Sequence, residues 1–386
     1  MKISIITGSR AEFHILKNLI FALKKDKKIK TNLVVTGSHL SSFFGNTINE
    51  INDQKIKITS KIDLSIKKDQ EKNIANSISL GVNSFSRLFK KNKPDLLLIL
   101  GDRYEIFSAA ISACVNRVPI VHIHGGERTA GLIDEGIRHS ITKLSHIHFV
   151  STNIYYNRVK QLGENKKFIF NVGSLGVEAT KKTKLLNKNE LEKVLNIKFQ
   201  SKNIIVTFHS ETLKTSLENK KNFKILLSAL GNLKNTSIIF TMPNADLDFK
   251  MIVKEIKKFI KLNKNSYFFK SLGHKKYFSL CKQVDLMIGN SSSGIIEMPS
   301  FKKGTINIGD RQGGRVKADS IIDSKFNKKE IIKKINYVYS KKFGKILKKM
   351  KNPYEKKNTS KKILKIIKKI NLKNILIKDF FDYKLR

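Results

Sequence analysis

The sequence predicts an α/β protein of two Rossmann-like, doubly wound domains that face a cleft. The chain has 386 residues, 40% of them apolar, which is enough for two domains with separate cores. Short apolar runs alternate with longer amphipathic stretches, as in the successive βα units of a parallel sheet. This alternation stops at a polar, lysine-rich stretch, residues 179–201, and then resumes.

The first half of the chain fills one domain, which we place at residues 1–175. Its apolar runs have the length of buried strands, and the segments between them carry Leu, Ile and Phe at helical spacing. The expected strands are residues 2–7, 32–36, 96–100, 120–124, 148–151 and 168–172, and the clearest helices are 13–23, 73–89 and 135–145.

The second half repeats this pattern, so we place a second Rossmann-like domain at residues 176–358. Residues 359–386 form a C-terminal segment in which Ile and Leu recur at helical spacing among lysines. Such a basic amphipathic helix could lie on a membrane. We expect it instead to pack on the body of the protein. The expected strands of the second domain are residues 203–208, 236–242, 267–270, 285–288 and 305–308.

The composition argues against several classes of protein. The 76 Lys and Arg exceed the 31 Asp and Glu, for a net charge of +45, but the basic residues are spread along the whole chain. We expect no nucleic-acid partner, because nucleic-acid-binding proteins concentrate basic residues on one face. No apolar stretch approaches the roughly 20 residues of a membrane span, and the first strand begins at residue 2. We therefore expect a cytoplasmic protein without a membrane partner.

Cysteine and histidine do not point to a metal site. Cys114 and Cys281 both lie in apolar runs, so we expect two buried free thiols without a disulfide framework. His122 and His124 are two apart on one strand and could be read as metal ligands. No third ligand follows at a diagnostic spacing. We expect hydrogen-bonding histidines, no metal and no cofactor.

Ligands of parallel α/β domains bind outside the carboxyl ends of the strands, and the polar motifs of the first half follow strands. Residues 8–12 form a glycine turn into a helix, which could hold a phosphate beside Arg10 or be an ordinary βα turn. Acids occur in residues 101–105, 122–128 and 134–139. Helix capping explains part of this pattern. Three acid-bearing segments with arginines and histidines nevertheless favour acid–base chemistry on an anionic substrate.

The second half adds motifs suited to a diphosphate. Residues 209–212 follow a strand, and residues 289–294 offer backbone amides and hydroxyls before a helix. Glu297 is placed one turn into that helix, where it could accept from a ribose hydroxyl pair or serve as a dipole partner. Arg311 could donate a charge-assisted hydrogen bond to a phosphate.

Together these motifs resemble the hydrolysing UDP-N-acetylglucosamine 2-epimerases of sialic acid biosynthesis. The resemblance covers residues 1–320 in order. It implies two Rossmann-like domains in the glycosyltransferase-B arrangement, with UDP held mainly by the second domain and the sugar facing the first. The motifs that carry it are residues 8–12, 45–47, 101–105, 122–127, 137–143, 289–294 and 307–312.

The resemblance implies a role for each matching residue. The expected catalytic residues are Asp102, Glu127, Asp134, Arg138 and His209. The expected substrate-binding residues are Arg10, Arg103, His209, Asn244, Gly273, His274, Ser292, Ser293, Gly294, Glu297 and Arg311.

The implied reaction releases UDP and N-acetylmannosamine from UDP-N-acetylglucosamine, for sialic acid-type sugar synthesis. UDP leaves by anti elimination to 2-acetamidoglucal, which is then hydrated. The alternative is the same chemistry on a UDP- or GDP-linked 2,4-diacetamido-2,4,6-trideoxyhexose, for legionaminic acid synthesis. We also expect a homo-oligomer, a dimer or tetramer.

Two other classes fit less well. A glycosyltransferase is compatible with a two-domain fold, but it would need an acceptor groove and would leave the three acids of the first half unexplained. An RNA-binding module would use the charge of +45, and its binding would collapse steeply with salt.

Overall fold

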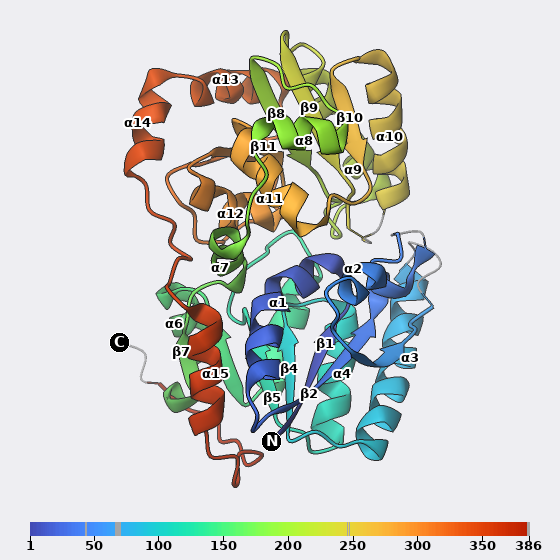
Figure 1. Cartoon of the computed structure of the whole chain (residues 1–386), viewed down its shortest axis with the longest axis vertical. Helices are drawn as coiled ribbons and strands as arrows, with labels where there is room; N and C mark the ends of the chain where they lie inside the picture. The colour runs from blue at the N-terminus through green and yellow to red at the C-terminus, as the bar shows by residue number, and fades with distance from the viewer. Residues whose placement is uncertain (43–44, 66–70, 245, 247, 384–386) are drawn as a thin grey trace. The chain divides into compact units, whose positions relative to one another are not determined.

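Two parallel β-sheets organise the chain (Figure 1). The structure, a computed structural model, describes residues 1–42, 45–65, 71–244, 246 and 248–383. These form an N-terminal unit of residues 1–127, 133–179 and 354–386, and a C-terminal unit of residues 128–132 and 180–353. The predicted boundaries, 175 and 358, treat each domain as one continuous stretch. In the structure, residues 128–132 belong to the C-terminal unit, and the chain returns to the N-terminal unit at residue 354.

The N-terminal unit contains a seven-stranded sheet in the order β3-β2-β1-β4-β5-β6-β7, with every neighbouring pair parallel. The order reverses between β1 and β4, the position where doubly wound folds bind ligands. Its strands are β1 Lys2–Thr7, β2 Lys30–Thr36, β3 Ile58–Ile62, β4 Leu96–Leu100, β5 Ile120–Ile123, β6 Ile147–Val150 and β7 Ile169–Asn171. Its helices are α1 Arg10–Lys25, α2 Ile48–Asn52, α3 Glu71–Lys91, α4 Tyr104–Val115, α5 Asp134–Leu144, α6 Asn153–Gln161 and α15 Thr359–Lys369, with α7 Leu175–Lys182 leading out of it.

Strand β4 shows why this sheet needs helices on both faces. Leu96, Leu98 and Leu100 belong to one apolar cluster, which α1 and α15 share. Leu97 and Ile99 point the other way, into a second cluster with α3 and α4. Because successive side chains of a strand alternate between faces, an uninterrupted apolar run is buried only if both faces are covered.

The C-terminal unit contains a six-stranded parallel sheet in the order β10-β9-β8-β11-β12-β13, which reverses between β8 and β11. Helices α9, α10 and α13 contribute to its main apolar cluster. Its strands are β8 Lys202–Thr207, β9 Thr236–Thr241, β10 Ser266–Phe269, β11 Leu286–Gly289, β12 Gly304–Ile308 and β13 Ile321–Ser324. Its helices are α8 Lys188–Leu195, α9 Ser216–Leu230, α10 Phe249–Leu262, α11 Gly273–Gln283, α12 Ser292–Ile296, α13 Lys328–Val338 and α14 Lys341–Lys349.

Eleven strands were expected from the sequence, and two more are present. The unexpected ones, β3 and β13, each lie at one edge of their sheet. β3 has the sequence ITSKI and β13 has IIDS, and only one residue of each is buried. An edge strand has one neighbour and more exposure to solvent, so it lacks the apolar run by which the central strands were recognised.

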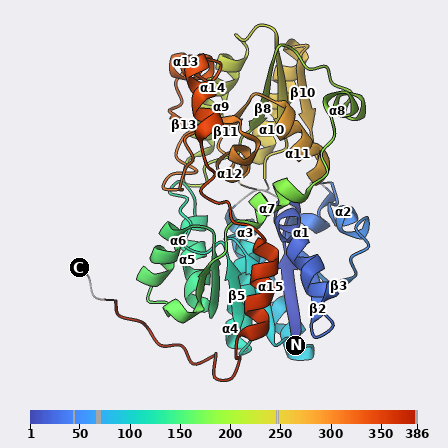
Figure 2. The same cartoon turned by 60° about the vertical axis from the view of Figure 1, so that its left-hand side comes forward.

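The C-terminal helix α15 packs on the body of the N-terminal unit. Its Ile363 and Ile367 are buried in the same cluster as Leu16 and Ile20 of α1. Both views show α15 beside α1 (Figures 1 and 2). Among the described residues, no helix is long and apolar enough to cross a membrane.

The expectation of two buried thiols is half wrong. Cys281 on α11 is buried, but Cys114 near the end of α4 is exposed. Its neighbour Val115 is also 74% exposed. The apolar character of α4 therefore extends beyond the face that the sheet covers.

The segment after α15 is tied to the N-terminal unit by a buried carboxylate. Glu164, 1% exposed, lies 2.7 Å from Lys143 Nζ, 2.8 Å from Lys378 Nζ and 3.0 Å from His148 Nε2. Burial acts to raise the pKa of Glu164, but the hydrogen bonds from His148 and the two lysines outweigh it and lower the pKa to about 2.

We predict that Glu164→Gln destabilises the protein by about 1.5–3 kcal/mol near neutral pH, since the partly exposed Lys143 and Lys378 lose hydrogen bonds to a charged group. The pKa of Glu164 is lowered by folding from 4.5 to about 2. Its contribution is therefore complete above about pH 4.5 and is lost as the pH falls towards 2. Urea denaturation at a series of pH values measures the difference from wild type, which should narrow over this range.

The matched control is Asp379→Asn, which removes an exposed carboxylate from the same C-terminal segment. It should change the unfolding free energy by less than about 0.5 kcal/mol. Equal destabilisation by the two variants would contradict a special role for Glu164.

Candidate functional site

The candidate residues of the N-terminal unit follow the strands at the reversal of its sheet. Arg10 is the first residue of α1, after β1, and Ser9 caps that helix. Asp102 and Arg103 follow β4, the other strand at the reversal, and Arg103 is the N-cap residue of α4. Glu127 lies in the loop after β5. The sheet order therefore brings together segments that are about 90 residues apart in sequence.

Arg138 connects two of the three predicted acids. It is 2% exposed, and its Nη2 forms a very short ion pair with Asp102. Its Nη1 donates to the backbone carbonyl of Glu127 at 3.0 Å. A second carboxylate, Glu135, lies 3.5 Å from Nη1. Because a guanidinium presents its donors in a rigid fork, Arg138 sets the position of Asp102 relative to the 124–127 loop.

The Glu127 carboxylate is almost completely buried, at 2% exposure. Its Oε1 accepts from Ser151 Oγ at 3.2 Å and lies 3.0 Å from Nδ1 of His124. His124 has φ +68, in the left-handed region that is strained for a residue with a Cβ. The other ring nitrogen of His124, Nε2, is buried without a hydrogen-bond partner among the described residues.

His122 lies on β5, whereas His124 directly follows the strand, and the two play different parts. His122 Nε2 donates to the carbonyl of Gly101 at 2.8 Å, and burial lowers the pKa of His122 to about 3. It is therefore a neutral group that joins the ends of β4 and β5. Among the described residues, no group of three or more His, Cys, Asp and Glu side chains could hold a metal ion.

Asp134 begins helix α5, which also carries Arg138. The two residues are four apart, so they lie on one face of the helix, one turn from each other. Asp102 thus contacts Arg138 through its carboxylate and Glu127 through its backbone carbonyl, while Asp134 lies one turn before Arg138 on α5.

In the C-terminal unit, Asn290 connects three loops at the corresponding reversal, between β8 and β11. Its Oδ1 accepts from the backbone N–H of His209, and its Nδ2 donates to the His209 carbonyl, both at 2.8 Å. The carbonyl of Asn290 accepts from Gln312 Nε2 at 2.9 Å. Asn290 is fully buried, so these bonds hold the loops that follow β8, β11 and β12.

A hydrogen bond fixes the tautomer of His209. Its Nδ1 accepts from the backbone N–H of Asn244 at 3.0 Å. In a neutral imidazole whose Nδ1 is an acceptor, Nε2 carries the proton. His209 can therefore donate a hydrogen bond from Nε2. Asn244 acts on this site through its backbone N–H, which fixes the tautomer of His209.

In the serine loop after β11, residues 290–294, some hydrogen-bond donors bond to acceptors of the same loop. Ser291 caps α12: its Oγ accepts from the N–H of Ser293, and its carbonyl accepts from the N–H of Gly294. Ser293 Oγ accepts from Tyr277 OH at 2.6 Å, which leaves its own hydroxyl proton free to point elsewhere. Ser292 is the first residue of α12.

Helix α12 is shorter than expected, and Glu297 is the residue that follows it. The prediction placed Glu297 one turn inside this helix. The chain continues instead as a 3₁₀ turn from Met298, because Pro299 lacks the N–H that a continuing helix requires. Glu297 is 7% exposed, and its charge raises the pKa of Tyr277 and Cys281, although burial is the larger cause for both.

Arg311 is paired within the C-terminal unit. Its guanidinium lies 2.9 Å from Asp246 Oδ2, and the two side chains are 8% and 10% exposed. Its backbone N–H donates to Glu211 Oε1, as does the N–H of Asp310. Gly309 has φ +75, and a Cβ there would meet Glu211 Oε1 at 2.4 Å. Glu211 therefore shapes the loop that carries Arg311.

Gly273 and His274 open helix α11. Gly273 has φ +61, and a Cβ at that position would meet no atom within 4 Å, so the residue faces open space. His274 packs on Phe278, with ring centroids 4.2 Å apart, and its Nδ1 lies 3.4 Å from Thr183 Oγ1.

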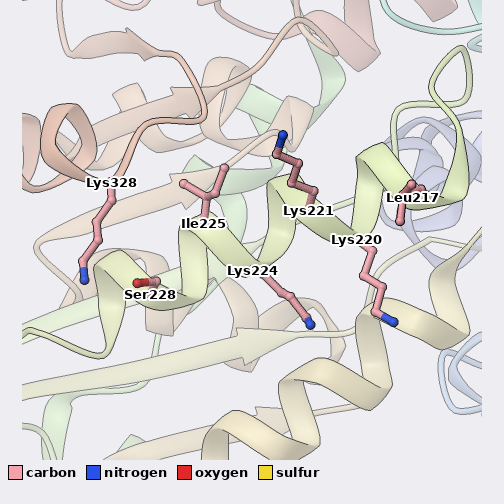
Figure 3. A pocket seen from close by; sticks show the side chains of 7 residues that line it. All are labelled: Leu217, Lys220, Lys221, Lys224, Ile225, Ser228 and Lys328. Carbon is pink, nitrogen blue, oxygen red and sulfur yellow. The ribbon is translucent and has the colours of Figure 1, made fainter.

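A cavity along α9 is separate from these residues (Figure 3). Four lysines, two aliphatic side chains and one serine line it, and none of the candidate residues does. The lining residues are Leu217, Lys220, Lys221, Lys224, Ile225, Ser228 and Lys328.

Four residues with structural roles at these loops were not among the predicted site residues: His124, Glu211, Tyr277 and Asn290. Three of them belong to motifs that were noticed in the sequence, but each acts by holding another side chain or loop. Tyr277 lies outside every motif, on α11, and only its contact with Ser293 reveals it. For His124, Glu211 and Asn290, the one signal in the sequence was their position shortly after a strand.

The comparisons with known proteins agree with this arrangement. A family model described as UDP-N-acetylglucosamine 2-epimerase matches residues 21–368. A GDP/UDP-N,N'-diacetylbacillosamine 2-epimerase (hydrolyzing) of Campylobacter jejuni is 43% identical over 99% of both chains. Polysialic acid biosynthesis protein P7 of Escherichia coli is 43% identical over 99% of this chain and 97% of its own. A UDP-N,N'-diacetylbacillosamine 2-epimerase (hydrolyzing) of Legionella pneumophila is 33% identical over 83% and 84%.

The fold also matches a solved structure, that of UDP-GlcNAc 2-epimerase from Neisseria meningitidis bound to UDP-GlcNAc. The TM-score is 0.80 over 96% of this chain and 100% of that one, at 20% sequence identity. This likeness confirms the predicted glycosyltransferase-B-like fold of two parallel-sheet domains. With the family model matching most of the chain and full-length relatives at 43% identity, this chain belongs to the UDP-N-acetylglucosamine 2-epimerase family and is an enzyme of the hydrolysing 2-epimerase type.

Proposed function

We propose that the enzyme acts on a UDP- or GDP-linked 2,4-diacetamido-2,4,6-trideoxyhexose and releases the nucleoside diphosphate and the free C2-epimer. The observation that supports this substrate most directly is the full-length identity of 43% to the diacetylbacillosamine 2-epimerase. The more distant relative from Legionella carries the same sugar in its name.

The chemistry requires the nucleotide to leave early. The C2 proton of such a sugar has no neighbouring carbonyl to acidify it, so a base can remove it only as the C1–O bond breaks. The electrons of the C2–H bond then form the C1–C2 double bond of a glycal, and those of the C1–O bond leave with the diphosphate. Water adds to C1, and a proton returns to C2 on the opposite face.

We assign the proton transfers to the acids of the N-terminal unit. Inversion at C2 requires proton handling on both faces of the ring, and three acids lie near one another in sequence or contact: Asp102 pairs with Arg138, Asp134 is one turn before it on α5, and the backbone carbonyl of Glu127 accepts from it. Glu127 is the best placed to act as a base, because its buried carboxylate is held by Ser151 and His124. A general acid or base in such a position contributes about 10²–10⁴-fold to the rate.

We assign the nucleotide to the loops of the C-terminal unit. The Ser293 hydroxyl, the N–H of Ser292 and Nε2 of His209 are donors for a diphosphate, whose charge grows as the C1–O bond breaks. Glu297 would accept from the ribose hydroxyls. In the N-terminal unit, Arg10 and Arg103 at the sheet reversal would add positive charge.

A second candidate substrate is UDP-N-acetylglucosamine, with N-acetylmannosamine as product. The relative named for polysialic acid biosynthesis is as similar to this chain as the diacetylbacillosamine enzyme is, at 43% identity. Both candidates share the reaction and differ in the groups at C4 and C6 of the sugar.

We predict that the diacetylbacillosamine nucleotide is turned over with a higher kcat/KM than UDP-N-acetylglucosamine. Proton NMR of parallel incubations measures both rates and identifies the products. In D2O the product should carry deuterium at C2, because the removed proton exchanges with solvent before another returns. Preference for UDP-N-acetylglucosamine would select the second candidate, and retention of hydrogen at C2 would exclude the elimination route.

A second prediction separates proton transfer from nucleotide binding. Glu127→Gln keeps the shape of the side chain but removes its basicity, so kcat should fall by about 10²–10⁴-fold while the affinity for free nucleoside diphosphate stays unchanged. Steady-state kinetics and isothermal titration measure these two quantities independently.

Glu297→Gln is the reciprocal variant. It should weaken nucleotide binding by about 1.5–3 kcal/mol, as expected for loss of a hydrogen bond to a charged group, and leave kcat at saturation nearly intact. A Glu127→Gln variant that lost nucleotide affinity but kept its saturated rate would show that Glu127 positions a ligand rather than transfers a proton.

A further inference from the structure

Two buried carboxyl groups converge behind the first strand-end loop, and the proposed reaction uses neither. Glu12 on α1 is 6% exposed and Glu105 on α4 is 1% exposed. The backbone N–H of Gly8 donates to Glu12 Oε2 at 2.7 Å. A Cβ on the same Gly8 would lie 2.5 Å from Cγ and 2.8 Å from Oε1 of Glu105. The two carboxyls therefore meet at one residue of the loop.

Their hydrogen bonds leave one negative charge uncompensated. Glu105 Oε1 accepts from Arg103 Nε at 2.9 Å. The second oxygen of each group, Glu12 Oε1 and Glu105 Oε2, is buried without a hydrogen-bond partner in the part of the chain that the structure describes. Two carboxylates so close together in a buried position cannot both ionise readily, because each charge opposes the other.

The groups around Glu12 and Glu105 do not offset the repulsion between the two carboxylates. Burial, followed by the charge of Glu105, raises the pKa of Glu12 to about 8, and the opposing effects of Gly8, Arg103 and Ser9 are smaller. On the 3₁₀ turn Gly37–Leu40, His39 contacts Thr7 Oγ1 at 3.1 Å, and burial lowers its pKa to about 4. His39 is thus neutral over the range in which Glu12 titrates.

Two charged groups near Glu12 on α1 do not titrate together with it. Arg10 stays protonated at every pH of interest. His14, one turn further along, lies 2.7 Å from Glu50, and burial is the main cause that lowers its pKa. Among these three groups, Glu12 is the one that changes charge at mildly alkaline pH.

We propose that the pair of Glu12 and Glu105 carries one proton, on Glu12, and that this pair positions Arg103 and the loop of residues 8–10 for binding the anionic part of the nucleotide sugar. This inference rests on the proposed function, which assigns Arg10 and Arg103 to substrate. With Glu12 neutral, Arg103 faces one carboxylate and the loop bears net positive charge. Loss of the proton adds a buried negative charge behind the loop, which opposes the diphosphate. Glu12 and Glu105 are positioning residues.

The first test is the pH dependence of KM from about pH 6 to about pH 9.5. In the wild type, KM should rise as Glu12 ionises around pH 8, while kcat follows a separate profile. Glu12→Gln, which mimics the neutral carboxyl, should match wild type below pH 7 and lack this rise. Glu105→Gln should raise KM about tenfold throughout, since Arg103 loses its carboxylate.

The matched control is Glu190→Gln, an exposed acid in the capping box of α8, and its KM profile should follow that of wild type. A Glu12→Gln variant that kept the wild-type rise in KM would overturn the proposal. So would a Glu105→Gln variant with unchanged KM.

A second measurement tests the pair without any substrate. Folding raises the pKa of Glu12 from 4.5 to about 8, so the native state loses stability as the pH rises between these values. The Tm of Glu12→Gln minus that of wild type should therefore increase from about pH 5 to about pH 8 and then level off. A Tm difference that stayed constant over this pH range would overturn the proposed proton on Glu12.

The KM profile and the Tm series together distinguish a failure of the proposed function from a failure of the inference about Glu12 and Glu105. If the enzyme turned over none of the nucleotide sugars, the proposed function would be wrong, and the Tm series would still decide whether Glu12 carries the proton. If the Tm series held while KM followed no such profile in an active enzyme, the pair would not act on substrate binding, and the proposal would be wrong.

Discussion

The structure depends on one constraint: the central strands of both sheets are buried on both faces, so the charged side chains of the candidate site lie where strands end. β4 has five apolar residues, all buried, and Asp102 and Arg103 follow within three positions of its last residue. In the other sheet β11 ends at Gly289, and Asn290 and Ser291 come next. Because all strands are parallel, these ends lie on one side of each sheet. Each order reversal leaves space there that no crossover connection covers.

Placing charged groups at a buried edge has an energetic cost that the surrounding residues must offset. An unpaired buried charge costs several kcal/mol, so each one is expected to have a partner. Arg138 pairs with Asp102, and Arg311 pairs with Asp246. Glu127 accepts a hydrogen bond from Ser151 and lies 3.0 Å from His124 Nδ1, and in the proposed reaction it would take up and release a proton there.

In both units buried side chains connect the loops at the strand ends, but the residues that do so differ. In the N-terminal unit a guanidinium and a neutral histidine connect the strand ends, through Arg138 and His122. In the C-terminal unit an amide does so, since Asn290 both donates to and accepts from His209. This difference follows the assigned roles: the first unit would handle protons among acids, and the second would hold a diphosphate through hydroxyl, backbone N–H and imidazole donors.

The sequence by itself determined the fold class, the eleven strands with apolar runs and the segments after strands to which we assign the chemistry. These features follow from local periodicity and from position after a strand, both of which are properties of short windows. The edge strands β3 and β13, the exposure of Cys114 and the early end of α12 depend on how many neighbours an element has, and short windows do not contain that information.

Only the tertiary structure decided which side chains meet. Arg138 is 36 residues from Asp102, and Tyr277 is 16 residues from Ser293. The pairing of Arg311 with Asp246 spans 65 residues. No pattern within a motif specifies such contacts, because they depend on strand order and on the way each loop returns to the sheet edge. The shifted pKa values of Glu12 and His122 have the same origin, since burial and neighbouring charge exist only after folding.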